Sequence, residues 1–403
     1  MDLGFSPEEE EFRAEVRSYL QQNIRACIRE AVLEEQPLPR EWNVEAQQIL
    51  NRAGYAVPHW PVEWGGRDWS AVKRAILTEE IDSMGVPRPL PFNVALIGPV
   101  IAAFGSEEQK RRFLPAIANL DMWFCQGFSE PDAGSDLASL KTSAVREGDG
   151  YRVNGQKTWT TYAQHADWIF CLVRTSREER KQQGISMMVM PMNSPGITVR
   201  PIRSIDGIHH INEVFLDDVH VPAEHLIGEE GRGWDYAKYL LGQERTSMGN
   251  VGFSRRRLAR IRARASQTQS RGCRIDEPAF RRRLTWAEIE LQALSITQMR
   301  VIDEGSAGDT GSAGPDPKTS ILKMKGAEML QRASELLLDT MGPEAMCNGA
   351  SLEGGDPLTE EGSERSAIVS AYFGSRKYSI FGGSNEIQRN ILAKAVLGLG
   401  KRT

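Results

Sequence analysis

The hydrophobic pattern of this chain changes its period twice, and that order limits the architectures into which it can fold. Helical spacing runs through residues 1–122, short apolar runs fill 123–228, and helical spacing returns over 229–403. Apolar residues that recur every three or four positions indicate amphipathic helices, whereas short apolar runs between turn residues indicate strands. We therefore expect an α+β multidomain protein with an N-terminal helical domain (1–122), a small β-sheet domain (123–228) and a C-terminal helical domain (229–403).

Local signals place several element ends. Ser6-Pro7-Glu8-Glu9 and Ser106-Glu107-Glu108-Gln109 each put a capping serine three residues before a glutamate or glutamine, which predicts a helix start. Two glycine-rich stretches, Glu304–Pro317 and Cys347–Gly362, predict exposed loops between the later helices. The apolar runs that predict strands are Trp168–Val173, Ile185–Met190, Ile197–Val199 and Glu213–Leu216.

Composition argues against several kinds of partner and site. The 403 residues are 40% hydrophobic and 26% charged with a formal net charge of -5, so a nucleic acid or an anionic membrane is not an expected partner. The sequence contains no apolar run near the roughly 20 residues that span a bilayer. Five scattered cysteines and six histidines show no metal-ligand spacing, which predicts a reducing compartment and no metal site. The N-terminus has no signal-like pattern, so we expect the cytoplasm, bacterial cytosol first, with a processed organellar protein as the alternative.

Arginines concentrate in one part of the C-terminal region. Two interpretations remain open, a solvated helix face with its connecting loop, or a contact for phosphate or for a partner protein. The arginines concerned are Arg255, Arg256, Arg257, Arg260, Arg262, Arg264, Arg271, Arg274 and Arg281–Arg283.

Two segments of the middle region carry the strongest chemical signal. Phe124–Thr142 is rich in turn residues and hydroxyls, and Gly155–Thr161 holds a tryptophan after a short strand signal. In this order and spacing they resemble the flavin-binding segments of acyl-CoA dehydrogenases, and the helix, sheet, helix order matches that family over essentially the whole chain. The resemblance implies FAD as cofactor and a four-helix bundle as the C-terminal domain.

The family activity that this resemblance implies is α,β-dehydrogenation of an acyl-CoA thioester to the 2-enoyl-CoA. A base removes the α-proton, and the β-hydrogen leaves as hydride to flavin N5 of FAD, which supplies the redox chemistry. By resemblance, Gln126, Ser129 and Thr161 contact the isoalloxazine ring and Trp159 packs on it. Ser135 contacts the CoA arm. Ser384 reads as the N-cap of the last helix, either capping alone or also favouring a reduced anionic flavin.

Glu244 is the candidate base. It shares one predicted helical face with apolar residues, and no basic residue lies three or four positions away to pair with it. A buried, unpaired carboxylate has a raised pKa, which suits a general base, although a partner from another helix or exposure at an edge is the alternative. Some family members carry their base in a Glu-Arg pair on this helix, and Glu244-Arg245 matches it, with Arg245 on the substrate side. The face comprises Ala237, Leu241, Glu244, Met248 and Val251.

Other members carry the base in a C-terminal loop of the form Tyr-Glu-Gly-Thr. The matching residues here are Phe381-Gly382-Gly383-Ser384, so Gly382 occupies the position of that glutamate and has no side chain. The resemblance then assigns the base to Glu244. It leaves the Gly382 N–H as a donor to the thioester oxygen, where negative charge develops.

The segments that hold the adenine end of FAD in homotetrameric relatives are not intact. Residues 262–290 lack the Arg-x-x-Phe-Gly segment, and Asp339-Thr-Met-Gly-Pro343 replaces the Gln-x-x-Gly-Gly turn, with an aspartate that would repel a pyrophosphate. We therefore hypothesise a tetramer that includes a homologous chain. The alternative is a homo-oligomer that holds FAD through other residues.

Three activities remain open at this point. They are an acyl-CoA dehydrogenase subunit, an oxygen-using relative such as an acyl-CoA oxidase or flavin monooxygenase, and a non-catalytic partner subunit. For the dehydrogenase, the family implies an electron-transfer flavoprotein as the electron acceptor. The glycines Gly382 and Gly383 free volume near the thioester, which favours branched or bulky acyl groups, including sterol-derived ones.

Overall fold

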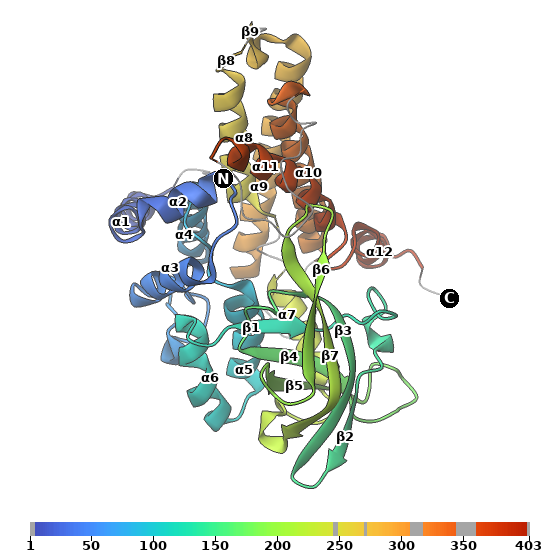
Figure 1. Ribbon diagram of the computed structural model, residues 1–403. Helices are drawn as coiled ribbons and strands as arrows, with labels where there is room; N and C mark the ends of the chain where they lie inside the picture. Colours follow the sequence, from blue (N-terminus) through green and yellow to red (C-terminus); the bar gives the residue numbers. More distant parts are fainter. Residues whose placement is uncertain (1–4, 245–248, 270–271, 307–316, 344–359, 401–403) are drawn as a thin grey trace.

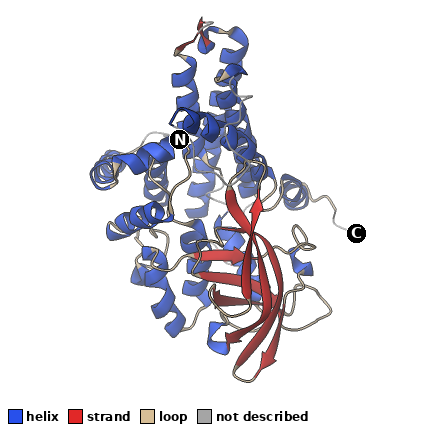
Figure 2. Ribbon diagram, in the orientation of Figure 1, coloured by secondary structure: helices blue, strands red, loops and turns tan. Residues whose placement is uncertain are grey.

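A computed structural model describes residues 5–244, 249–269, 272–306, 317–343 and 360–400. It confirms the predicted α+β architecture of helices, then a sheet, then helices (Figures 1 and 2). The exact domain boundaries at 122 and 228 stay predictions.

The N-terminal part is a layer of helices packed beside the sheet (Figure 1). Ser6 and Ser106 both form the predicted capping boxes, in which each serine accepts from the residue three positions on and that residue bonds back to the serine N–H. The elements are α1 (Pro7–Asn23), α2 (Ala26–Leu33), α3 (Arg40–Arg52), α4 (Ala71–Ser83), a π-helical segment η2 (Phe92–Ile97), α5 (Gly98–Phe104) and α6 (Glu107–Asn119).

The middle part is a seven-stranded sheet in the order β1-β4-β2-β3-β7-β6, with β5 on β4. Strand β4 is buried on both faces, and its alternate residues enter two different cores. Phe170 and Leu172 pack with the N-terminal helices, whereas Cys171 and Val173 pack with the other strands. The strands are β1 (Phe124–Gly127), β2 (Ser143–Glu147), β3 (Gly150–Thr161), β4 (Trp168–Arg174), β5 (Ile185–Pro191), β6 (Ile197–Arg203) and β7 (His209–Pro222).

Helices α8 to α11 form the elongated upper part of the molecule, with the short β8–β9 hairpin at its tip, whereas α7 lies beside the sheet (Figure 1). Helices α8 to α11 contribute to one apolar core, as expected for a bundle. The elements are α7 (Gly233–Glu244), α8 (Val251–Ala265), β8 (Thr268–Gln269), β9 (Gly272–Cys273), α9 (Pro278–Ser306), α10 (Lys318–Asp339), α11 (Glu360–Gly374), η7 (Ser375–Ser379) and α12 (Asn385–Ala395).

Two local predictions in this part are corrected. The predicted face from Ala237 to Val251 does not belong to one continuous helix, because α8 begins at Val251 after Asn250, which has a left-handed conformation (φ 47°), whereas α7 is described over Gly233–Glu244. The loops at 304–317 and 347–362 are shorter than expected, since α9 continues to Ser306 and α11 begins at Glu360. The rest of both loops, apart from Pro317, lies outside the described residues.

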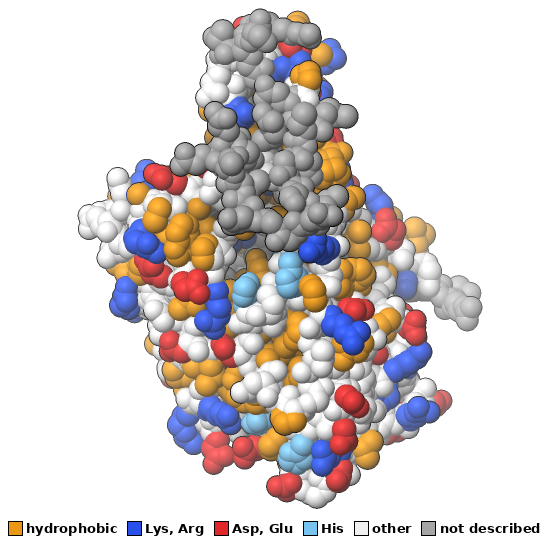
Figure 3. Space-filling model, in the orientation of Figure 1, with side chains coloured by type: hydrophobic (Ala, Val, Ile, Leu, Met, Phe, Trp, Pro, Cys, Tyr) orange, Lys and Arg blue, Asp and Glu red, His pale blue; other side chains and the backbone are white. Residues whose placement is uncertain are grey.

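The described part of the chain contains no helix long and apolar enough to cross a membrane. Side chains of both charges are interspersed on the face shown in Figure 3, which agrees with the nearly balanced composition.

Candidate active site

The two flavin-motif segments lie against each other. The Thr158 N–H donates to the Ser129 carbonyl at 2.9 Å, which fixes the end of the β1 segment beside strand β3. This contact sets Ser129 close to Trp159 and Thr161, while Gln126 lies half-buried on β1 itself. The structure therefore brings together the two segments that the sequence singled out.

A buried ion pair holds this junction in place. The Lys157 ammonium, fully buried, donates to a Glu130 carboxylate oxygen at 2.7 Å and to the Leu172 carbonyl at 2.7 Å. Glu130 also accepts from the backbone N–H groups of Lys141 (2.6 Å) and Thr142 (3.0 Å). Burial acts to raise the pKa of Glu130, but the charge and hydrogen bond of Lys157 and the bonds at Lys141 and Thr142 outweigh it, so its pKa is lowered. The loop between Glu130 and Thr142, which contains Ser135, is thus anchored at both ends.

Trp159 stands out of the sheet because the strand bulges there. The pairing of β3 with β7 shifts register between Lys157 and Thr160, and Trp159 has a φ of 61°. A left-handed conformation costs a bulky residue on the order of 1 kcal/mol, and such strain concentrates at functional sites. The consequence is an indole that is 60% exposed, beside the half-buried Thr161. An exposed aromatic face of this kind can stack on a planar ring.

The C-terminal glycine loop is tightly held but keeps a free donor. Gly382 and Gly383 have φ values of 64° and 78°, which glycine adopts without strain. The Gln388 amide donates to both of their carbonyls, at 3.2 and 3.3 Å, and accepts from the Ser320 hydroxyl at 2.7 Å. Within the described ranges the Gly382 N–H makes no hydrogen bond. That N–H is therefore available to a ligand.

A chain of contacts joins this loop to the flavin segments. The Tyr162 N–H donates to the His210 carbonyl at 2.8 Å, and the His210 ring lies 2.7 Å from the Lys377 ammonium. The Phe381 N–H in turn donates to the Lys377 carbonyl at 3.1 Å. Burial lowers the pKa of both His210 and Lys377, and their mutual repulsion lowers that of His210 further. Sequence reasoning missed this link, because His210 and Lys377 are distant in sequence and belong to no motif.

Four candidate residues remain, and the structure describes them to different extents. Ser384 is the N-cap of α12, as predicted, accepting from the Ile387 N–H at 3.4 Å. Ser135 is exposed in the loop that Glu130 anchors. Glu244 is the last described residue of α7, but its side chain lies outside the described residues, as does Arg245 entirely. The pairing and burial predicted for Glu244 stay predictions.

Comparison with known proteins gives the family. Models described as the N-terminal, middle and C-terminal domains of acyl-CoA dehydrogenase match residues 6–121, 125–219 and 231–397. The chain is 35% identical over 404 residues to acyl-CoA dehydrogenase IpdE1 of Mycobacterium tuberculosis, with 97% of each covered. It is 34% identical to acyl-CoA dehydrogenase FadE26 of the same organism, with 99% of each covered. The chain belongs to the acyl-CoA dehydrogenase family.

Solved structures agree over the full length. The ChsE4-ChsE5 complex of Mycobacterium tuberculosis matches with a TM-score of 0.82 at 31% identity, and the Tcur3481-Tcur3483 steroid acyl-CoA dehydrogenase with 0.85 at 27%, each covering 100% of both chains. This acyl-CoA dehydrogenase is thus an oxidoreductase that dehydrogenates acyl-CoA, and FAD is its cofactor.

The residues present fit an isoalloxazine ring. The exposed Trp159 offers a stacking face, Ser129 and Thr161 offer hydroxyls from the joined segments, and the Gly382 N–H is an unused donor among the described residues. The N-terminus of α12 at Ser384 adds a helix dipole that favours negative charge.

Proposed function

We propose that this chain catalyses α,β-dehydrogenation of an acyl-CoA thioester to the 2-enoyl-CoA, with Glu244 as the base. The free N–H of Gly382 is the observation that carries the proposal. A preorganised donor at the thioester oxygen stabilises the negative charge that develops as the α-proton leaves, and it acts without a side chain at that position.

The protein residues divide the remaining work. The Glu244 carboxylate takes the α-proton, and the electron pair of that bond forms the Cα–Cβ double bond. FAD, when bound, accepts the β-hydrogen as hydride, so that the two electrons leave the substrate. Gln126, Ser129, Thr161 and Trp159 bind and orient the ring, and Ser135 with Arg245 binds the substrate.

The test is an anaerobic titration of the flavin absorbance with acyl-CoAs, followed by steady-state kinetics of Glu244→Gln. Loss of a general base lowers kcat about 10²- to 10⁴-fold, with folding and flavin content unchanged. The exposed Glu63 provides the matched control, and Glu63→Gln keeps full activity. Retained activity in Glu244→Gln would identify a non-catalytic subunit instead, and rapid reoxidation of the reduced flavin by air would identify an oxygen-using relative.

We also propose that a homologous chain completes the cofactor site. The Arg-x-x-Phe-Gly and Gln-x-x-Gly-Gly segments are absent from this sequence, and the two solved relatives above are each named for two different chains. Purification alone and after co-expression with a homologue separates the possibilities. A colourless chain that gains flavin only with its partner supports the heteromer, whereas a fully flavinylated homo-oligomer contradicts it. The electron-transfer flavoprotein as acceptor and the bacterial cytosol as location stay predictions.

A further inference from the structure

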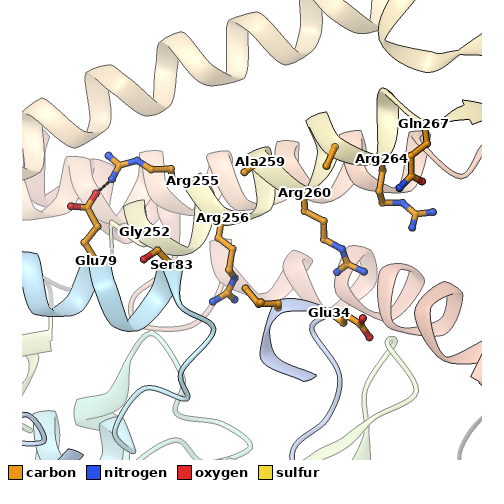
Figure 4. A pocket seen from close by; sticks show the side chains of 12 residues that line it. Glu34, Glu79, Ser83, Gly252, Arg255, Arg256, Ala259, Arg260, Arg264 and Gln267 are labelled. Atoms are coloured by element: carbon orange, nitrogen blue, oxygen red, sulfur yellow. Dashed lines mark ion pairs between the residues drawn. The ribbon is translucent and has the colours of Figure 1, made fainter. Parts of the chain in front are cut away.

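A cavity of about 690 Å³ runs along one face of α8 and is rich in arginine (Figure 4). Arg256, Arg260 and Arg264 are spaced four residues apart, so they lie on one helical face. Figure 4 shows all three extending to the same side of the helix, toward the end of α2 at Glu34. The cavity lining carries more arginines than carboxylates, and Glu79, one of its two glutamates, is already paired with Arg255. The cavity is therefore electropositive.

Arg256 lines this cavity, and its charge is not paired with a carboxylate of the described residues. It donates to the Asp82 backbone carbonyl at 2.7 Å and forms no ion pair with any described residue. The two carboxylates nearby already have partners, since Asp82 binds Arg88 at 2.6 Å and Glu35 binds Arg257 at 2.8 Å. Burial lowers the pKa of Arg256 by more than the negative charges of Asp82 and Glu35 raise it, and the charges of Arg88 and Arg257 lower it further. A partly buried cation of this kind is stabilised by an oxyanion ligand.

Arg256 also lines a second cavity, of about 270 Å³, which borders the flavin segment at Tyr162. Trp123, Tyr162 and Phe253 form apolar parts of its wall. Tyr162 directly follows Thr161, one of the residues assigned to the flavin ring. A single guanidinium therefore borders both a partly aromatic cavity next to the flavin segment and the electropositive cavity on α8.

Resting on the function proposed above, we propose that Arg256, with Arg260 one turn further along α8, binds a carboxylate at the far end of the substrate's acyl group. The substrate class is then a long or bulky acyl-CoA with a terminal carboxylate. The hydrocarbon part of its acyl group passes the aromatic wall at Tyr162. This assigns a role to part of the arginine cluster that the sequence left open.

The test uses pairs of CoA thioesters with the same acyl skeleton, one ending in a carboxylate and the other in its neutral methyl ester, assayed with the flavin-loaded protein and its partner chain if one is required. We expect Arg256→Gln to lower kcat/KM for the carboxylate form by about 10- to 100-fold, the loss of a hydrogen-bonded charge pair. The value for the ester form stays near that of the parent, and Arg256→Lys recovers part of the loss. Arg282→Gln is the control, since Arg282 is exposed on α9 and lines neither cavity.

A binding measurement keeps this inference separate from the proposed reaction. Thioesters with sulfur in place of the β-methylene cannot be dehydrogenated, and calorimetry of the same pairs gives their affinities without turnover. The inference is supported if the carboxylate form binds more tightly and this preference is lost in Arg256→Gln. Failure of every thioester to bleach the flavin would refute the proposed reaction and leave this inference standing. Equal binding of the two forms overturns the inference. The inference is also overturned if inorganic phosphate binds through Arg256 while the two thioesters of each pair bind equally, because the cavity then binds a separate oxyanion.

Discussion

Removing the Lys157 ammonium should destabilise the protein more than any comparable change at the surface. In Lys157→Met the methionine fills a similar volume, but Glu130 keeps its charge at a site where its side chain is only 6% exposed. Two donors to Glu130 survive, the N–H groups of Lys141 and Thr142, and they compensate in part. Breaking a buried ion pair by removing one partner costs about 3 to 5 kcal/mol, and these surviving bonds place the expected loss near 3 kcal/mol.

The matched control is Lys181→Met. Lys181 pairs with Asp136 at 2.6 Å in the same loop region, but both side chains are more than half exposed. Water and salt screen such a pair, so Lys181→Met should have the same urea midpoint of unfolding as the parent protein. Urea unfolding followed by tryptophan fluorescence, together with the flavin content of each variant, gives the comparison. If Lys157→Met loses no more stability than Lys181→Met, the ion pair does not hold the two flavin segments together.

The same pair predicts a pH dependence, and three other substitutions test the site. The pKa of Glu130 is lowered in the folded state, so its contribution to stability is present above about pH 4.3, its unfolded pKa, and is lost as the pH falls through the folded pKa. The free energy of unfolding, measured against pH in acid, should show this loss in the parent but not in Glu130→Gln. His210 also has a lowered pKa, so the unfolded chain binds its proton first and stability falls as the pH drops below about 6.5; His210→Asn should flatten that part of the unfolding profile. Gly382→Ala places a side chain at φ 64° and should cost about 1 kcal/mol and lower kcat with little change in the flavin spectrum. Ser384→Ala removes the α12 cap and should cost about 1 kcal/mol, measured by thermal unfolding; an additional fall in flavin potential would show that Ser384 also acts on the flavin.

Most of the fold followed from local patterns. The runs at Trp168–Val173 and Ile185–Met190 became strands within one residue of the predicted ends, because a strand buried on both faces needs an unbroken apolar run. Both predicted capping boxes formed, because the residues that build them are three positions apart and need no tertiary contact.

The departures came from geometry that no short pattern encodes. The apolar spacing continues from Ala237 to Val251, so periodicity alone predicts one helix, but Asn250 adopts a left-handed conformation that separates α7 from α8. Trp159 is exposed because β3 changes register against β7, a strand more than 50 residues away. The site residues show the same division. Ser129 and Trp159 lie in recognisable motifs, whereas the contact between His210 and Lys377 arises only when the tip of the sheet meets the C-terminal helices.

Asp339 lies where homotetrameric relatives have the glutamine of the Gln-x-x-Gly-Gly turn, and its ion pairs bear on whether the cofactor site needs a partner chain. From sequence, its carboxylate should repel a pyrophosphate. In the structure it binds Arg274 at 2.8 Å and Arg283 at 2.6 Å, so its charge is neutralised and repulsion is not the reason to expect a partner chain. The stronger reason is that these ion pairs engage two guanidinium groups of the region in which homotetrameric relatives carry their Arg-x-x-Phe-Gly segment. Asp339→Gln would release both arginines. If that variant binds flavin without a partner chain, then the ion pairs of Asp339, rather than the missing Arg-x-x-Phe-Gly segment, make the parent chain depend on a partner chain.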